Sequence, residues 1–311
     1  MNALIGCTGF VGKNLQNKGY DALYHSKNID AIVGKKYNRL VCAGIRAEKF
    51  LANQYPEQDL QAIKVLIEKL KQVTCQTFVL ISTIDVYKDP IGVDETTIID
   101  VENTQPYGAN RCYMEAFVRS HYENYLIVRL PALFGKGLKK NFIYDMIHKI
   151  PSMIMATKFE ELLNKVEAQQ KNVLQSGYLT NDQGNWVLKS DLDEDTKEKL
   201  KTTLEQLGFT SLVFTDCRSK FPFYDLSNLQ EDINRALEHN IKELNIAVEP
   251  ISAQEVASSC FGVTFENTIE NRQPVTYDMK SVYAADFGGK NGYLYTKEDT
   301  IAAIKKFLDT N

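Results

Sequence analysis

The sequence is poor in the features that mark nucleic-acid-binding, membrane and secreted proteins. Its 36 lysines and arginines are outnumbered by 40 aspartates and glutamates, so there is no basic excess to hold nucleic acid. No apolar run approaches the roughly 20 residues that a membrane-spanning helix needs. A glycine-rich segment occupies residues 6–12, where a signal peptide would lie, and we therefore expect no signal peptide and a cytoplasmic protein.

Signals for metal sites and disulfides are equally sparse. Six cysteines and four histidines are scattered over 311 residues, with no C-x-x-C spacing. Several cysteines fall within apolar segments, as Cys42 does, so we expect reduced thiols and predict no metal site. A hydrophobic content of 44% with 24% charged residues is ordinary for a globular protein. The length allows one large α/β unit with an added piece, or two domains.

Three glycines near the N-terminus give the strongest local signal. Gly6, Gly9 and Gly12 follow the apolar run 1–5 at G-x-x-G-x-x-G spacing, and residues 13–19 are compatible with a helix. A strand that turns sharply into a closely packed helix is easiest where Cβ atoms are missing. The free N–H groups and the dipole of such a helix start can hold a pyrophosphate. The segment therefore predicts a dinucleotide site, with a tight strand–helix turn without ligand as the alternative.

Strand and helix signals alternate after this loop to about residue 130. Short apolar runs indicate the strands, and apolar residues at three- and four-residue steps indicate the helices. The predicted elements are strands at 20–25, 38–44, 77–81 and 126–130 and helices at 59–72 and 106–121. This order predicts an α/β fold of the Rossmann type, with a doubly wound parallel sheet and right-handed crossovers.

The end of the second strand bears on which dinucleotide would bind. A carboxylate there would hold a ribose 2′-hydroxyl and favour NAD, but residues 25–28 read His-Ser-Lys-Asn. Ser26 and Lys27 suit a 2′-phosphate, so NADP is favoured over NAD, although a solvated loop lysine explains Lys27 equally well. Ala43 and Gly44 end the third strand, and such small residues would let a ligand lie against the backbone.

Two further segments complete a known pattern. Residues 82–87 read Ser-Thr-Ile-Asp-Val-Tyr, and residues 106–111 read Pro-Tyr-Gly-Ala-Asn-Arg at the start of a helix. With the glycine triplet, these segments resemble the extended short-chain dehydrogenase/reductase family, which includes sugar-nucleotide epimerases, dehydratases and 4-keto-sugar reductases. The resemblance is strong over residues 1–150, weaker over 214–311 and absent between them.

The resemblance implies roles for individual residues around a coenzyme. Thr83 would polarise the substrate oxygen, and Tyr107 would be the catalytic acid/base. The alternatives are a strand-end hydroxyl that caps a loop for Thr83 and an aromatic side chain packed on the sheet for Tyr107. Phe10 and Val11 would contact the coenzyme together with the loop glycines, Ala43 and Gly44. Arg129 is a further coenzyme contact that the resemblance implies.

Three residues are implied on the substrate side. Asp85 follows Thr83, and Lys139 and Asn141 precede the next helix. In the family an asparagine at that helix start contacts the diphosphate of a sugar nucleotide, and neighbouring basic residues assist. The alternative for Asn141 is a helix N-cap, with Lys139 solvated.

One position departs from the family pattern. The family's lysine, four residues after the catalytic tyrosine, is Arg111 here. Free tyrosine titrates near pH ~10, so a tyrosine base needs a nearby cation that lowers its pKa. Arg111 shares a helical face with Tyr107 and can supply this charge and bind the nicotinamide ribose. It cannot relay a proton because a guanidinium stays protonated. We expect catalysis to survive, with the proton relayed through the ribose hydroxyl and water.

The chain is expected to have three parts. Residues 1–150 are the predicted coenzyme-binding domain, 151–213 an inserted α+β subdomain, and 214–311 a smaller C-terminal substrate lobe with elements that return to the first domain. The insertion predicts two amphipathic helices around a β-hairpin at 177–188. A strand is expected at 211–214. The insertion could cover the substrate, form a homodimer contact or have neither role.

Two functions fit these features. The favoured one is an NAD(P)-dependent oxidoreductase or epimerase that acts on a nucleotide-linked sugar or a related keto or hydroxy compound, with Tyr107 as acid/base. The alternative is a non-catalytic sensor or assembly subunit of the same fold, which Arg111 in place of lysine favours. The expected partner is a small molecule, and neither nucleic acid nor a membrane is expected to bind.

Overall fold

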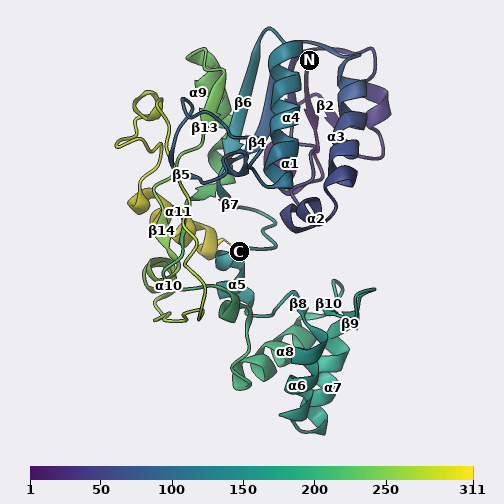
Figure 1. Cartoon of the computed structure of the whole chain (residues 1–311), viewed down its shortest axis with the longest axis vertical. Coiled ribbons are helices and arrows are strands. Elements are labelled where there is room, and N and C mark those ends of the chain that lie inside the picture. Colours follow the sequence, from purple (N-terminus) through teal and green to yellow (C-terminus); the bar gives the residue numbers. More distant parts are fainter. Residues whose placement is uncertain (311) are drawn as a thin grey trace. The chain divides into compact units, whose positions relative to one another are not determined.

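The chain forms two compact units, and the computed structural model describes its residues 1–310 (Figure 1). Each unit is assembled from separate stretches of sequence. Unit 1 comprises Met1–Leu138, Lys220–Ile251 and Thr276–Asn311, and unit 2 comprises Lys139–Ser219 and Ser252–Val275. The predicted boundaries after residues 150 and 213 do not coincide with these units, so the three-part division stays a proposal about domain organisation.

Unit 1 is built on a six-stranded parallel sheet. Its strand order is β13-β6-β4-β3-β1-β2, and every neighbouring pair runs parallel. The strands are β1 (Asn2–Ile5), β2 (Ala22–Tyr24), β3 (Lys36–Cys42), β4 (Thr74–Thr83), β6 (Tyr125–Leu130) and β13 (Glu243–Asn245). The chain order reverses between β1 and β3. Open α/β sheets bind their ligands at the carboxyl ends of the strands at such a switch point.

Helices cover both faces of this sheet (Figure 1). On one face, Ile67 and Met114 pack with Phe78 in one apolar cluster, and on the other face Leu15 and Ile233 belong to a second cluster. The helices of unit 1 are α1 (Phe10–Leu15), α2 (Lys49–Gln54), α3 (Pro56–Leu70), α4 (Pro106–His121), α9 (Leu229–Glu238) and α11 (Lys297–Asp309). The predicted doubly wound fold of the Rossmann type is confirmed.

Shorter elements complete unit 1. Three pairs of short strands are β5 (Ile91–Val93) with β15 (Asp278–Met279), β7 (Ala132–Phe134) with β12 (Phe223–Asp225), and β11 (Lys220–Phe221) with β14 (Ile251–Ser252). The 3₁₀ helices are η1 (Ile29–Ile32), η2 (Ile84–Val86), η4 (Leu226–Asn228) and η5 (Ala284–Phe287). Among the helices of residues 1–310, none combines the length and the apolar character needed to cross a bilayer.

Unit 2 contains a three-stranded sheet and helices with their own core. The core joins Phe159 and Leu174 to Leu200, and Trp186 stacks on Phe159 with 4.1 Å between ring centroids. The sheet order β8-β10-β9 is antiparallel. Its elements are α5 (Phe142–His148), β8 (Met153–Ile154), α6 (Ala156–Asn164), α7 (Ala168–Gly177), β9 (Tyr178–Thr180), β10 (Trp186–Leu188), α8 (Glu194–Gln206), η3 (Ser211–Phe214) and α10 (Ala253–Phe261).

The predicted hairpin in unit 2 is confirmed as β9 and β10, one predicted strand is wrong, and two elements were missed. The expected strand at 211–214 is the 3₁₀ helix η3, whose flanking amides bond three residues back, as Thr215 N–H does to the Leu212 carbonyl at 3.2 Å. A four-residue apolar run does not distinguish a strand from one helical turn. Helix α7 and strand β8 were not predicted, and the sequence of α7 is largely polar.

Candidate active site

The glycine loop has the shape that the sequence predicts. Gly6 has a φ of +85°, and a Cβ atom there would lie 2.3 Å from the Ala43 carbonyl oxygen. A Cβ atom on Gly12 would lie 2.0 Å from the Gly6 oxygen. Gly9 is the N-cap of α1 and makes no side-chain hydrogen bond to the first turn. Because glycine has no side chain, the first-turn amides of α1 have no side-chain cap, which fits a pyrophosphate.

The other predicted coenzyme residues lie at the carboxyl ends of the neighbouring strands. The N–H groups of Gly6 and Cys7 donate to the Tyr24 carbonyl at 2.8 and 3.1 Å, which joins the loop to the end of β2. Ser26 and Lys27 follow that strand end and are exposed. A Cβ atom on Gly44 would lie 2.7 Å from a methyl group of the Ile5 side chain, so the end of β3 also lies close to β1.

Thr83 and Tyr107 come from two elements that are packed tightly together. Thr83 ends β4, and Tyr107 is the second residue of α4. A Cβ atom on Gly108 would lie 1.9 Å from the Asp85 carbonyl oxygen, so the start of α4 lies directly against η2. The Thr83 hydroxyl accepts the Asp85 N–H at 3.2 Å and donates to an Asp85 carboxylate oxygen at 3.3 Å. Thr83 thus caps η2 as well as facing Tyr107.

The protonation of Tyr107 reflects opposing influences. Burial of the phenol raises its pKa, the positive charge of Arg111 lowers it, and the negative charge of Asp85 raises it again. Hydrogen bonding by Arg111 and Thr83 also lowers the pKa. The net pKa lies above the usual value of 10, contrary to the lowering that the sequence led us to expect. The contribution of Arg111 nevertheless has the expected sign.

Arg111 is held by protein groups on three sides. Its guanidinium lies over the Tyr107 ring, 4.1 Å from the centroid. Its two terminal nitrogens donate to the Asp59 carboxylate at 2.5 and 3.2 Å, and one of them also donates to the Arg46 carbonyl. The side chain is only 4% exposed. Asp59, which the sequence analysis missed, therefore neutralises much of the charge that Arg111 brings to Tyr107, and the predicted ribose contact stays a prediction.

A lysine that the sequence analysis missed lies beside these residues. The Lys49 ammonium donates to an Asp85 carboxylate oxygen at 2.6 Å and to the Tyr277 hydroxyl at 3.4 Å. Burial works against the charged form of Lys49, but Asp85 and Tyr277 outweigh it and raise the pKa of Lys49 above 10.5. Asp85, predicted as a substrate contact, is thus ion-paired within the protein.

Arg129 lies in a buried ionic network behind the site. It is 1% exposed and donates to Glu115 at 2.8 and 3.1 Å, to Glu243 at 2.7 Å and to the Tyr87 hydroxyl at 3.0 Å. These contacts join β6 to α4 and β13. The coenzyme contact that the resemblance implies for Arg129 stays a prediction, because the contacts that the structure records are with protein groups.

Unit 2 holds the predicted substrate residues Lys139 and Asn141. Asn141 is the N-cap of α5, where its side-chain oxygen accepts the Tyr144 N–H at 3.1 Å. The N-cap alternative is therefore realised, and a diphosphate contact stays a prediction. Lys139 is exposed in the segment before α5.

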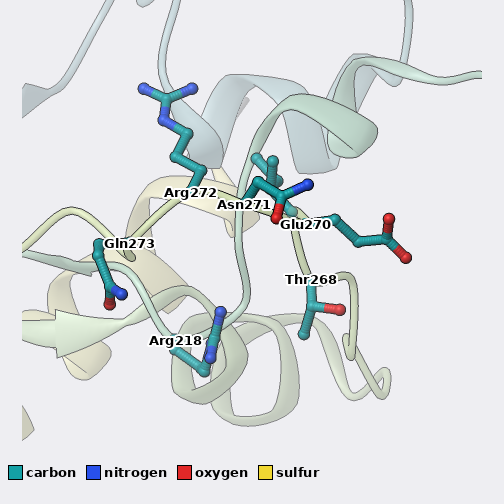
Figure 2. Close-up of a pocket in the computed structure, with 7 residues that line it drawn as sticks. Arg218, Thr268, Glu270, Asn271, Arg272 and Gln273 are labelled. Atoms are coloured by element: carbon teal, nitrogen blue, oxygen red, sulfur yellow. The ribbon is translucent and has the colours of Figure 1, made fainter.

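Unit 2 also contains a pocket of about 500 Å³ that the sequence did not reveal. Figure 2 shows the Arg218 side chain and the segment 268–273 around it; the residues that line the pocket are Arg218, Thr268, Ile269, Glu270, Asn271, Arg272 and Gln273. Asp216 accepts from Arg218 Nε and Nη2 at 2.9 and 2.8 Å and from the Ile269 N–H at 3.0 Å. Arg218 and the Ile269 amide hold the pKa of Asp216 well below its usual range.

The model of one protein family matches part of the chain. Residues 35–170 match the model of the NAD dependent epimerase/dehydratase family. The matched range contains the segments that carry Thr83, Tyr107 and Arg111, and the glycine loop at 6–12 precedes it. This match supports the resemblance to the extended short-chain dehydrogenase/reductase family over residues 35–170. A comparison with curated proteins found no match to the sequence.

Several solved structures share the fold over the whole chain. A dTDP-4-dehydrorhamnose reductase from Bacillus anthracis, in complex with NADP, has a TM-score of 0.60 and 14% identity, with coverage of 100% of this chain and 98% of that chain. A UDP-glucose 4-epimerase from Thermotoga maritima, with UDP-glucose, has a TM-score of 0.56 and 14% identity, with coverage of 99% and 98%. At these identities the likeness establishes the fold.

The structure brings together some of the predicted site residues. The predicted coenzyme residues of the glycine loop lie beside the ends of β2 and β3, and Thr83, Asp85, Tyr107 and Arg111 form a second group in the same unit. Lys139 and Asn141 belong to unit 2. Within residues 1–310, His, Cys, Asp and Glu side chains form no group of three or more that could hold a metal ion.

Proposed function

We propose that the protein is an NAD(P)-dependent oxidoreductase or epimerase that acts on a nucleotide-linked sugar or a related keto or hydroxy compound. The observation that carries this proposal is the group formed by Thr83, Tyr107 and Arg111, which lies in the same unit as a glycine loop at the switch point of the sheet. A titratable residue with a perturbed pKa beside a ligand-binding edge, as Tyr107 is here, is typical of an active site.

The residues at the switch point fit a dinucleotide coenzyme. The first-turn amides of α1 behind Gly9 would hold the pyrophosphate, and Ala43 and Gly44 would lie against the coenzyme. Ser26 and Lys27 would bind the 2′-phosphate of NADP, which we favour over NAD. When bound, the coenzyme supplies or accepts a hydride at the substrate carbon.

The protein's own part in the reaction is a proton transfer at the substrate oxygen. In the reductive direction the Tyr107 hydroxyl gives its proton to the oxygen of a keto group, and in the oxidative direction the phenolate takes it back. The Thr83 hydroxyl donates a hydrogen bond to the same oxygen. To do so, it must give up the hydrogen bond that it donates to Asp85. The Arg111 guanidinium over the ring favours the phenolate.

The pocket in unit 2, taken by itself, has the chemistry of a site for the phosphate groups of a nucleotide-linked sugar. Arg218 and Arg272 line it, and guanidinium groups are well suited to phosphate oxygens. Asp216 fixes Arg218 through Nε and Nη2, so the guanidinium is oriented before a ligand binds. Similar folds include enzymes named for dTDP- and UDP-linked sugars, which is consistent with this substrate class.

The enzymatic proposal is tested by following the absorbance of NADPH with a panel of 4-keto-sugar nucleotides. We expect turnover that falls by roughly 10²–10⁴-fold in Tyr107→Phe, because the acid/base hydroxyl is removed. Tyr113→Phe is the matched control, since Tyr113 lies on the same helix and is 46% exposed. Full activity in Tyr107→Phe would refute the assigned role.

The second candidate function is a coenzyme-binding protein without turnover. The ion pair between Arg111 and Asp59 and the raised pKa of Tyr107 favour it, because both work against a phenolate. Tight NADPH binding, measured as a rise in melting temperature, with no oxidation across the substrate panel would support this candidate.

Coenzyme choice has its own test at Lys27. Lys27→Ala should weaken NADP binding by roughly tenfold, since one charge-assisted hydrogen bond is lost, and leave NAD binding unchanged. Equal NADP affinity in the parent and the variant would show that Lys27 does not hold the 2′-phosphate.

A further inference from the structure

Tyr107 lies beside two ion pairs from different elements. Arg111 is paired with Asp59, and Asp85 is paired with Lys49. The four charges add to zero, and without Lys49 they would add to −1. Since negative charge opposes a phenolate, the site depends on Lys49 for its charge balance.

Helix α2 fixes Lys49 relative to Tyr107. Asn53, one turn after Lys49, accepts the Tyr107 N–H at 2.9 Å, and its amide nitrogen donates to the Gln105 side chain at 2.9 Å. Residues four apart share a helical face, so α2 presents Asn53 to the start of α4 and Lys49 to Asp85. The Lys49 side chain is 41% exposed, which gives its ammonium access to water.

We propose that Lys49 performs the part of the family's lysine that Arg111 cannot perform: it supplies a dissociable cation beside Asp85 and returns a proton to Tyr107 through Asp85 and Thr83. This inference rests on the proposed function, in which Tyr107 gives a proton to substrate. A lysine is suited to the role because its ammonium can lose and regain a proton, whereas a guanidinium stays charged.

The proton balance of this path is closed. Tyr107 gives its hydroxyl proton to the substrate oxygen as the hydride reaches the carbon, and a phenolate remains. The Thr83 hydroxyl passes its proton to the phenolate and takes one from Asp85, and Asp85 takes one from Lys49. Lys49 is reprotonated from water, so each group gives one proton and gains one. Lys49 donates to Asp85 at 2.6 Å, in the direction of its transfer. Thr83 and Asp85 are 3.3 Å apart, and there the Thr83 hydroxyl donates, so it must turn toward the phenolate before it accepts a proton from Asp85.

The pKa values of the groups at the two ends of the path are both raised. The pKa of Tyr107 is raised above 10, chiefly by burial, and that of Lys49 is raised above 10.5 because Asp85 and Tyr277 outweigh its burial. The charged and titratable groups that face the pair are Asp85 of η2, Arg111 of α4, Asp59 of α3 and Tyr277.

The charge role is tested on the coenzyme-free protein by titrating Tyr107. The protein is labelled with 3-fluorotyrosine, the fluorine signal of residue 107 is assigned with Tyr107→Phe, and its chemical shift is followed against pH. Lys49→Met should raise the pKa of residue 107 by at least about one unit, and Lys49→Arg should leave it near the parent value. Lys69→Met is the matched control, because it breaks the ion pair between Lys69 and Asp30 elsewhere in unit 1.

The proton return is tested by steady-state kinetics over a range of pH. Lys49→Met and Lys49→Arg should both lower kcat at least tenfold with KM changed less than threefold, and added ethylamine should restore part of the rate of Lys49→Ala. Parent-like kcat in Lys49→Arg would overturn the proton return, and an unchanged titration of residue 107 in Lys49→Met would overturn the charge role. A parent protein without turnover would instead overturn the proposed function, and the proton return with it.

Discussion

Replacing Gly12 by alanine tests the glycine loop where its geometry is tightest. The new Cβ atom would lie 2.0 Å from the Gly6 oxygen, 2.7 Å from the Gly6 carbonyl carbon and 2.8 Å from the Cys7 Cα atom. All three are backbone atoms that cannot rotate away, and real Cβ contacts stay beyond 3.0 Å, so the start of α1 must move by about 1 Å. We expect a loss of about 1–3 kcal/mol in the free energy of unfolding, as for other overpacked sites.

The same displacement should weaken coenzyme binding. A misplacement of about 1 Å can lower the effect of a positioned group roughly 10²-fold, so NADPH affinity should fall by at least tenfold. Thermal unfolding with and without NADPH measures both effects, and the melting temperature should fall by roughly 2–4 °C per kcal/mol. Gly9→Ala is the control for stability, because its Cβ atom would lie 3.3 Å from the Gly6 oxygen at a φ of −74°.

Two results would refute this reasoning. A Gly12→Ala protein that melts with the parent would show that the loop accommodates a side chain. A destabilised Gly12→Ala protein with parent affinity for NADPH would show that the amides behind the glycines do not hold the coenzyme.

Three further perturbations test the surroundings of the site. Arg129→Met should lower stability by about 3–5 kcal/mol in denaturant unfolding, because it leaves the fully buried Glu115 without its main partner, and adding Glu115→Gln should recover much of the loss. Burial raises the pKa of Asp145 from 3.8 to about 6, so its ionisation opposes folding as pH rises between these values. Asp145→Asn should therefore stabilise the protein by about 1–3 kcal/mol at pH 8 and by little below pH 4; an equal effect at both pH values would contradict this sign. Arg111→Lys should lower the melting temperature and leave turnover no higher than in the parent, because an ammonium cannot keep both Asp59 and the Arg46 carbonyl bound; a faster enzyme would contradict this reading.

The fold could be predicted from the sequence where local patterns decide the structure. Helix α4 begins at Pro106 and ends at His121 as expected, because proline favours the first helical turn and the apolar residues repeat at helical steps. The glycine loop was foreseen because its backbone geometry depends on residues six apart. Helix α7 was missed because it buries only Leu174 and Gly177, so its sequence carries little apolar pattern.

The candidate site could be predicted only in part because its partners are distant in sequence. Thr83 and Tyr107 were foreseen from a family pattern. Lys49 is 36 residues from Asp85, and Asp59 is 52 residues from Arg111, so only packing of α2 and α3 against α4 brings them together. Arg218 gave no signal either, since a single arginine in a loop has no periodicity to mark it.

The arginine at position 111 changes which helix provides a side chain that can exchange a proton. Its planar guanidinium binds Asp59 with two nitrogens and the Arg46 carbonyl with one of them. The same group lies over the Tyr107 ring. A compact ammonium could not make all of these contacts, so the arginine joins α4 to α3 and to the loop before α2 but provides no exchangeable proton. Lys49 on α2 lies half-exposed at the other side of Asp85. In the family pattern, one lysine provides both the charge over the phenol and the access to a solvent proton. Here Arg111 on α4 provides the charge, and Lys49 on α2 provides the access.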